Sequence, residues 1–142
     1  MFQGTSLLAL DAKGRLSLPS RYRESLLLSC QGDVTLTRHP DGCVLIYPRA
    51  VWYELRPQLA QLPYSARALQ RILLGSAVDV SADSSGRLLI PSELRNLCGL
   101  GRDVALVGLG NRFELWDQVK YVEFEKAELA KGLPAEVDSL RL

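Results

Sequence analysis

The sequence predicts an α+β protein with a mainly β core and short helices, in which one β-β-α-β-β-α unit occurs twice in tandem. The first observation is a repeat: residues 11–23 (DAKGRLSLPSRYR) and 83–95 (DSSGRLLIPSELR) agree at seven of thirteen positions without gaps. The second is that each copy precedes two strand-like runs and then a helical pattern. The third is the length of 142 residues, which suits one ordinary domain or two very small ones.

A tight turn follows the first predicted strand of each unit. In the first unit the strand covers residues 5–10, and Asp11-x-x-Gly14 supplies turn residues directly after it. An Asp carboxylate here accepts backbone N–H bonds from the residues that follow, and Gly adopts the positive φ that closes the turn. Asp83 and Gly86 repeat the pattern, so we expect two equivalent turns.

The residues after each turn alternate between apolar and polar. Leu16 and Leu18 are expected to face the core, which places Arg15 on the opposite face. Pro19 ends this strand, and Ser20 is the expected N-cap of a short helix. The other elements expected are strands at 34–37 and 43–47, a helix from Pro48 with Trp52, Leu55 and Leu59 on one face, a helix over 65–74 with Leu69, Ile72 and Leu73 inward, and a helix capped by Asp117.

The two units are expected to share one core. Four short strands cannot close a barrel, and each half alone would leave long exposed edges. We therefore expect the halves to pack about a pseudo-two-fold axis with interlocked hairpins, as a double-barrel-like domain. The expected boundaries are residues 1–60 for the first repeat, 61–75 for a linker helix, 76–131 for the second repeat and 132–142 for a flexible tail.

Composition argues against several classes of protein. Hydrophobic residues make up 47% and charged residues 23%, as in soluble globular proteins, and no apolar run approaches the roughly 20 residues of a membrane span. The N-terminus has no signal-peptide pattern, so the cytoplasm is the expected location. Three cysteines (Cys30, Cys43, Cys98) and a single histidine, His39, lack metal-ligand spacing; we expect mostly buried, reduced thiols, no metal and no cofactor.

The sequence predicts no enzyme and no small-molecule substrate. Two Asp residues in matching turns could share a proton, as in aspartic proteases, but that chemistry requires carboxylates free of cations. Here Asp11 is followed four residues later by Arg15, and Asp83 by Arg87, which favours ionised carboxylates. No other nucleophile or phosphate-loop motif is present.

The Asp and Arg of each turn permit two interpretations. In the first, each pair only organises its hairpin. In the second, Arg15 and Arg87 also point outward to a partner, because two guanidinium groups on one surface suit phosphates and guanine edges. The charge distribution weakly favours the second: residues 1–110 carry 12 basic and 9 acidic groups (+3), and residues 111–142 carry 5 and 7 (−2).

The chain resembles the MraZ family, whose genes head the bacterial division and cell-wall gene cluster. The resemblance rests on Phe2-x-Gly4, on the two Asp-x-x-Gly-Arg-Leu-x-Leu/Ile-Pro segments, and on Phe113-Glu-Leu-Trp116, and it covers nearly the whole chain. It implies a swapped-hairpin fold of the AbrB/SpoVT type and a ring-shaped homo-oligomer associated with the nucleoid. It further implies a transcriptional regulator, with repression as the expected sign, that binds double-stranded DNA at direct repeats in its own promoter.

The family's Asp-x-x-x-Arg signature maps onto Asp11 and Arg15 and onto Asp83 and Arg87. The expected DNA-binding residues are therefore Asp11, Lys13, Gly14, Arg15, Asp83, Gly86 and Arg87. Lys13 has no basic counterpart, because Ser85 takes its place, so the two turns are not expected to contribute equally. Trp52 and Trp116 are candidates for ring contacts, although core positions fit their spacing better. The alternative function is a non-enzymatic, ring-forming adaptor in which the Asp–Arg pairs are purely structural.

Overall fold

The computed structural model describes residues 1–142, and each repeat contributes four strands. The strands are β1 (Phe2–Ala9), β2 (Arg15–Ser17), β3 (Asp33–Arg38), β4 (Val44–Pro48), β5 (Val78–Ser81), β6 (Arg87–Leu89), β7 (Asp103–Gly110) and β8 (Phe113–Asp117). The helices are α1 (Ser20–Cys30), α2 (Arg49–Ala60), α3 (Arg67–Gly75), α4 (Ser92–Leu97) and α5 (Gln118–Ala130), with short 3₁₀ turns η1 (Tyr64–Ala66) and η2 (Ala135–Val137). No helix has the length and apolar character that crossing a membrane requires.

The two repeats exchange strands. Six antiparallel strands form one sheet in the order β1-β7-β8-β4-β3-β5, and β2 pairs with β6 in a second, two-stranded sheet. The first strand of each repeat therefore pairs with the third strand of the other repeat: β1 with β7, and β5 with β3. This confirms the predicted fold class and the interlocking of the halves about a pseudo-two-fold axis.

A core of 18 buried residues joins the two halves. Leu16 and Leu88, which face each other across the β2–β6 pair, are both fully buried. Phe113 stacks on Phe2 with ring centroids 4.2 Å apart and meets the edge of Tyr22 at 4.8 Å. Because these contacts connect residues from both repeats, neither half has a complete core of its own.

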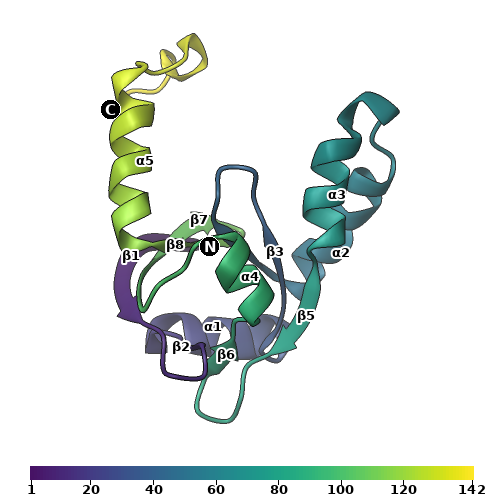
Figure 1. The fold of residues 1–142 in the computed structure, drawn as a ribbon, viewed down its shortest axis with the longest axis vertical. Coiled ribbons are helices and arrows are strands. Elements are labelled where there is room, and N and C mark those ends of the chain that lie inside the picture. Colours follow the sequence, from purple (N-terminus) through teal and green to yellow (C-terminus); the bar gives the residue numbers. More distant parts are fainter.

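Two helical projections leave the core at the end opposite the turns (Figure 1). One is the α2–α3 pair, which packs over a small cluster that contains Trp52, and the other is α5, whose base packs over Trp116. The turns between β1 and β2 and between β5 and β6 lie side by side at the other end (Figure 1). The fold thus separates a turn face from a helical face.

Several local expectations were wrong. Ser20 is the first residue of α1 and not its N-cap; Pro19 occupies the cap position in an extended conformation. Leu69 is 37% exposed and does not face inward, whereas Leu73 does.

Both tryptophans are core residues. Trp52 and Trp116 are each only 3% exposed, so neither offers the apolar surface that a contact between protomers would need. Trp116 donates from its indole nitrogen to Glu114 and packs against Phe124 of α5. Both tryptophans therefore occupy the core positions that their spacing favoured, and neither is placed to make a contact between protomers.

Candidate nucleic-acid interface

The first turn, residues 11–15, is organised by one carboxylate. Asp11 Oδ1 accepts the backbone N–H groups of Lys13 and Arg15, each at 2.9 Å. Its other oxygen, Oδ2, accepts the side-chain Nε–H of Arg15 at 2.6 Å. We call residues 11–15 the first tip. Its carboxylate shapes the turn and fixes the guanidinium at the same time.

The second turn, residues 83–87, repeats this geometry and is called the second tip. Asp83 Oδ1 accepts the N–H groups of Ser85 at 2.9 Å and Arg87 at 3.0 Å, and Oδ2 accepts Arg87 Nε–H at 2.8 Å. The match confirms that the repeated motif builds the same local structure twice. Lys13 and Ser85, at the corresponding exposed positions, remain the chemical difference within the tips.

The carboxylates of the tips are held ionised. The backbone N–H of Arg15 lowers the pKa of Asp11 most; desolvation opposes it as the next-largest effect, and the Arg15 side chain and the Lys13 N–H lower the pKa further. Asp83 has its pKa lowered in the same way by Arg87. A carboxylate that stays ionised and is occupied by donors is unsuited to proton transfer.

Each tip arginine keeps donors available for a partner. Only the Nε–H of Arg15 and of Arg87 is used within the protein, and the terminal nitrogens make no hydrogen bond in the structure. Both side chains are about one-third exposed or less. A guanidinium held in place by a carboxylate, with its outer edge unoccupied, can donate hydrogen bonds to a phosphate oxygen or to the acceptor edge of a guanine.

Two arginines that sequence reasoning did not assign to the site cover the tips. Gly14 and Gly86 have positive φ, +82° and +74°, and both also allow a close approach. A Cβ on Gly14 would lie 2.6 Å from Cζ and Nε of Arg95, and one on Gly86 would lie 2.3 Å from Cδ and Nε of Arg23. Each arginine belongs to the repeat opposite the tip that it covers.

Hydrogen bonds extend this cross-connection. The Gly14 carbonyl accepts the N–H of Ile90, and the Ile90 carbonyl accepts Nε–H of Arg95 at 2.9 Å. The second tip has the equivalent bonds. The Gly86 carbonyl accepts the N–H of Leu18, and the Leu18 carbonyl accepts the Nε–H of Arg23 at 3.1 Å. Arg23 and Arg95 are identical positions in the aligned repeat, and that identity was the only sequence signal of their role.

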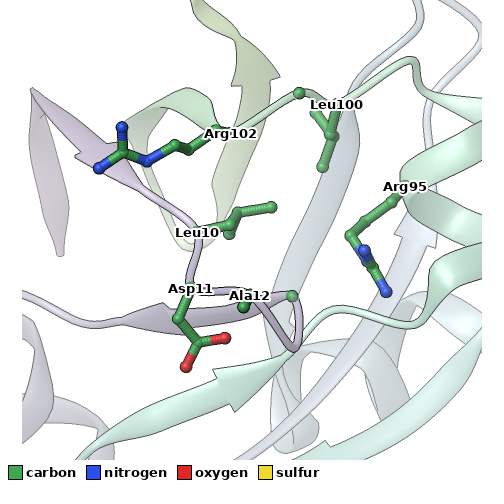
Figure 2. Close-up of a pocket in the computed structure, with 8 residues that line it drawn as sticks. Leu10, Asp11, Ala12, Arg95, Leu100 and Arg102 are labelled. Carbon is green, nitrogen blue, oxygen red and sulfur yellow. The ribbon is translucent and has the colours of Figure 1, made fainter.

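A hollow of about 480 Å³ lies beside the first tip. Figure 2 shows Arg95 and Arg102 on opposite sides of it, with Leu10 and Leu100 between them and the turn at Asp11 and Ala12 along one side. The remaining lining residues are Gly14 and Gly101. The site therefore includes a concave, partly basic surface next to one of its two tips.

Comparison with known proteins identifies relatives over almost the whole chain. A family model described as "MraZ protein, putative antitoxin-like" matches twice, over residues 1–74 and 72–136, in agreement with the tandem duplication. Proteins named "Transcriptional regulator MraZ" from Bordetella pertussis, Janthinobacterium sp. and Burkholderia ambifaria are 58%, 57% and 52% identical over 134 residues. Each alignment covers 94% of this chain and 94% of the relative.

Proposed function

Because the chain belongs to the MraZ family, we propose that it is a DNA-binding regulator of transcription that contacts double-stranded DNA through its two tips. The observation that carries the proposal is the pair of carboxylate-aimed arginines, Arg15 and Arg87, with free terminal nitrogens on one face of a shared core. The same relatives are named transcriptional regulators.

The tips suit a groove of DNA better than a small ligand. The β2–β6 pairing joins the strands that leave the two turns, so the spacing of Arg15 and Arg87 is set by the core. Asp11 and Asp83 keep both side chains in one orientation, which lowers the entropy lost when a bidentate contact forms. Lys13 adds a further phosphate contact at the first tip only.

One protomer offers too few cations for tight binding. Three phosphate contacts give a salt slope of only about −2.7, because each contact contributes about −0.9. A ring-shaped homo-oligomer raises the affinity, since each further protomer docks at high local concentration when the operator repeats match its spacing. We propose direct repeats in the protein's own promoter, at the division and cell-wall gene cluster, as this operator, with repression as the outcome on the nucleoid.

The helical face offers the surfaces for such a ring. On α5 the side chains of Val119 and Val122 are 66% and 59% exposed, although they lie on an ordered helix. The α2–α3 pair carries four arginines and one glutamate over residues 49–75, whereas α5 carries three glutamates and two lysines. A contact of α5 with α2–α3 of a neighbour buries the valines, joins opposite charges, and leaves the tips free.

Substitution of the tip arginines tests the proposal. In Arg15→Ala the hydrogen bonds that Asp11 accepts from the backbone N–H groups remain, so the turn should persist and little stability should be lost, because an exposed ion pair contributes little. Binding to DNA from upstream of the gene should weaken strongly in Arg15→Ala and Arg87→Ala and disappear in the double variant. We expect the larger loss in Arg15→Ala, because Lys13 makes the first tip the stronger one.

The control is Arg141→Ala, which removes one positive charge from the exposed C-terminal segment. Affinity is measured by fluorescence anisotropy at several salt concentrations, and folding by circular dichroism. If the double variant binds with unchanged affinity and salt slope, the proposal is wrong. A lower melting temperature without any change in DNA binding would instead support the adaptor function, in which the Asp–Arg pairs are purely structural.

A further inference from the structure

The hollow beside the first tip has an excess of positive charge. Its only carboxylate, Asp11, is already paired with Arg15. Arg95 donates only its Nε–H, to a backbone carbonyl, and Arg102 takes part in no ion pair of the structure. Both arginines line the hollow, but the Arg102 side chain lies on its rim with the guanidinium pointing away from Arg95 (Figure 2). Such donors favour an anion.

The shape of the hollow also suits a phosphate joined to a sugar. A volume of about 480 Å³ exceeds the needs of a lone anion, and the surface between the two arginines is formed by Leu10 and Leu100. The N–H of Gly101 is occupied by Asp117, so the donors available to a ligand come mainly from the arginine side chains. A charged group with an apolar body can use both parts of this lining.

The second tip lacks this feature. The corresponding space holds only about 100 Å³ and is bordered by Leu26, Leu27 and Gly32. Two sequence differences account for the change. Leu27 lies within α1, whereas the corresponding residue of the second repeat, Gly99, has φ +59° and lies after the end of α4. Gly32 directly precedes β3, whereas Arg102 directly precedes β7. The shorter helix opens the hollow and the arginine adds charge to its rim.

We propose that the hollow binds a backbone phosphate of DNA beside the base step contacted by the first tip, through Arg95, which borders the hollow, and through the exposed side chain of Arg102 on its rim. This inference rests on the proposed function and deepens it. The first tip would then bind DNA more strongly, through Arg15, Arg95, Arg102 and Lys13, than the second tip. Phosphate contacts set position and register without reading sequence, so Arg102 is a positioning residue for the first tip.

Arg102→Gln is the direct test, because its exposed side chain makes no hydrogen bond in the structure and its carbonyl bond to Leu10 is unaffected. We expect the affinity for promoter DNA to fall about threefold to tenfold for specific and non-specific sequences alike, and the salt slope to decrease by about 0.9 per bound protomer. Arg141→Gln, with the same change of charge in the C-terminal segment, should behave like the wild type.

A second measurement uses inorganic phosphate as the probe in the absence of DNA. The NMR signals of Arg102 and Arg95 Nε–H should shift on phosphate addition in the wild type, and the Arg95 shift should weaken in Arg102→Gln. If phosphate shifts these signals but Arg102→Gln leaves the DNA salt slope unchanged, the hollow serves a free phosphorylated ligand and the inference is overturned.

The outcomes separate this inference from the proposed function. If Arg102→Gln keeps the wild-type salt slope while Arg15→Ala loses DNA binding, the inference fails and the proposed function stands. If the double variant of Arg15 and Arg87 also binds like the wild type, both fail. A loss in Arg102→Gln for one DNA sequence only would overturn the positioning role, because a phosphate contact affects all sequences.

Discussion

Substitution of Gly86 by Ala tests whether the two repeats hold each other's tips. The added Cβ would lie 2.3 Å from Cδ and Nε and 2.7 Å from Cγ of Arg23, which are central atoms of that side chain. No small shift of the guanidinium relieves this overlap. Arg23 must leave the turn, and its hydrogen bond from Nε to the Leu18 carbonyl, at 3.1 Å, is lost with it.

The expected loss of stability in Gly86→Ala is the sum of a backbone cost and the cost of a lost hydrogen bond. A positive φ costs an alanine about 1–2 kcal/mol. Loss of a hydrogen bond from a charged donor costs about 1.5 kcal/mol at a half-buried site. We therefore expect Gly86→Ala to lower the free energy of unfolding by about 3 kcal/mol. At Gly14 the nearest atoms are the outer end of Arg95, which can move more easily, so Gly14→Ala should cost about 2 kcal/mol.

Gly42→Ala is the matched control. Gly42 has φ +101°, and a Cβ there would have nothing within 4 Å, so only the backbone cost applies. Urea unfolding of the three variants, at one protein concentration to hold any oligomerisation constant, gives the ranking Gly42, Gly14, Gly86 in increasing cost. In an Arg23→Ala background the excess at Gly86 should disappear. An equal cost at Gly42 and Gly86, or an excess that persists without Arg23, would refute the cross-connection.

Three other predictions concern pH, the buried polar contact and assembly. The pKa of Asp11 and Asp83 is lowered below 3.8 in the folded protein, so the unfolded state binds more protons, and stability should fall as pH decreases below about 4; in Asp11→Asn/Asp83→Asn, urea midpoints should depend less on acid pH. Thr37→Val should cost about 1 kcal/mol in urea unfolding, because the buried Thr37 hydroxyl donates to the Leu73 carbonyl at 2.6 Å and ties β3 to α3. If the proposed ring forms through α5, Val119→Asp/Val122→Asp should give smaller species than the wild type in native mass spectrometry while the fold is retained, and an unchanged mass would rule out α5 as the contact.

The sequence was informative wherever structure depends on nearby residues. Asp11 and Gly14 define a turn within four residues, and the alternation of Leu16 and Leu18 places Arg15 away from the core. These features were predicted, and the internal repeat predicted that they would occur twice. The DNA-binding role of the tips and the domain boundaries stay predictions, since geometry alone does not test them.

Sequence was least informative where distant segments meet. The covering of Gly14 by Arg95 depends on the exchange of strands between repeats, which local patterns do not encode. Pro19 takes the cap position that Ser20 was expected to fill, because the turn of the chain at proline already sets the first helical residue. The hollow could not be predicted either, since it results from the early end of α4 at Leu97, beside a turn more than eighty residues away in the chain.

The exchange of strands limits how the two copies can diverge. Each tip depends on its own Asp and Gly and on an arginine from the other repeat, so Arg23 and Arg95 cannot be lost independently without exposing the opposite turn. Positions outside this network carry no such constraint. Two such positions differ between the repeats: Lys13 corresponds to Ser85, and Arg102 corresponds to Gly32.

These differences have a common direction. Both Lys13 and Arg102 add positive charge at or beside the first tip, and the early end of α4 opens the hollow proposed to hold a phosphate. A symmetric pair of tips would bind a site equally well in either orientation. Under the proposed function, unequal tips favour one orientation of each protomer on DNA, and protomers that all share one orientation require operator sites arranged head to tail. The asymmetry between the repeats therefore supports direct repeats, rather than a palindrome, as the proposed operator.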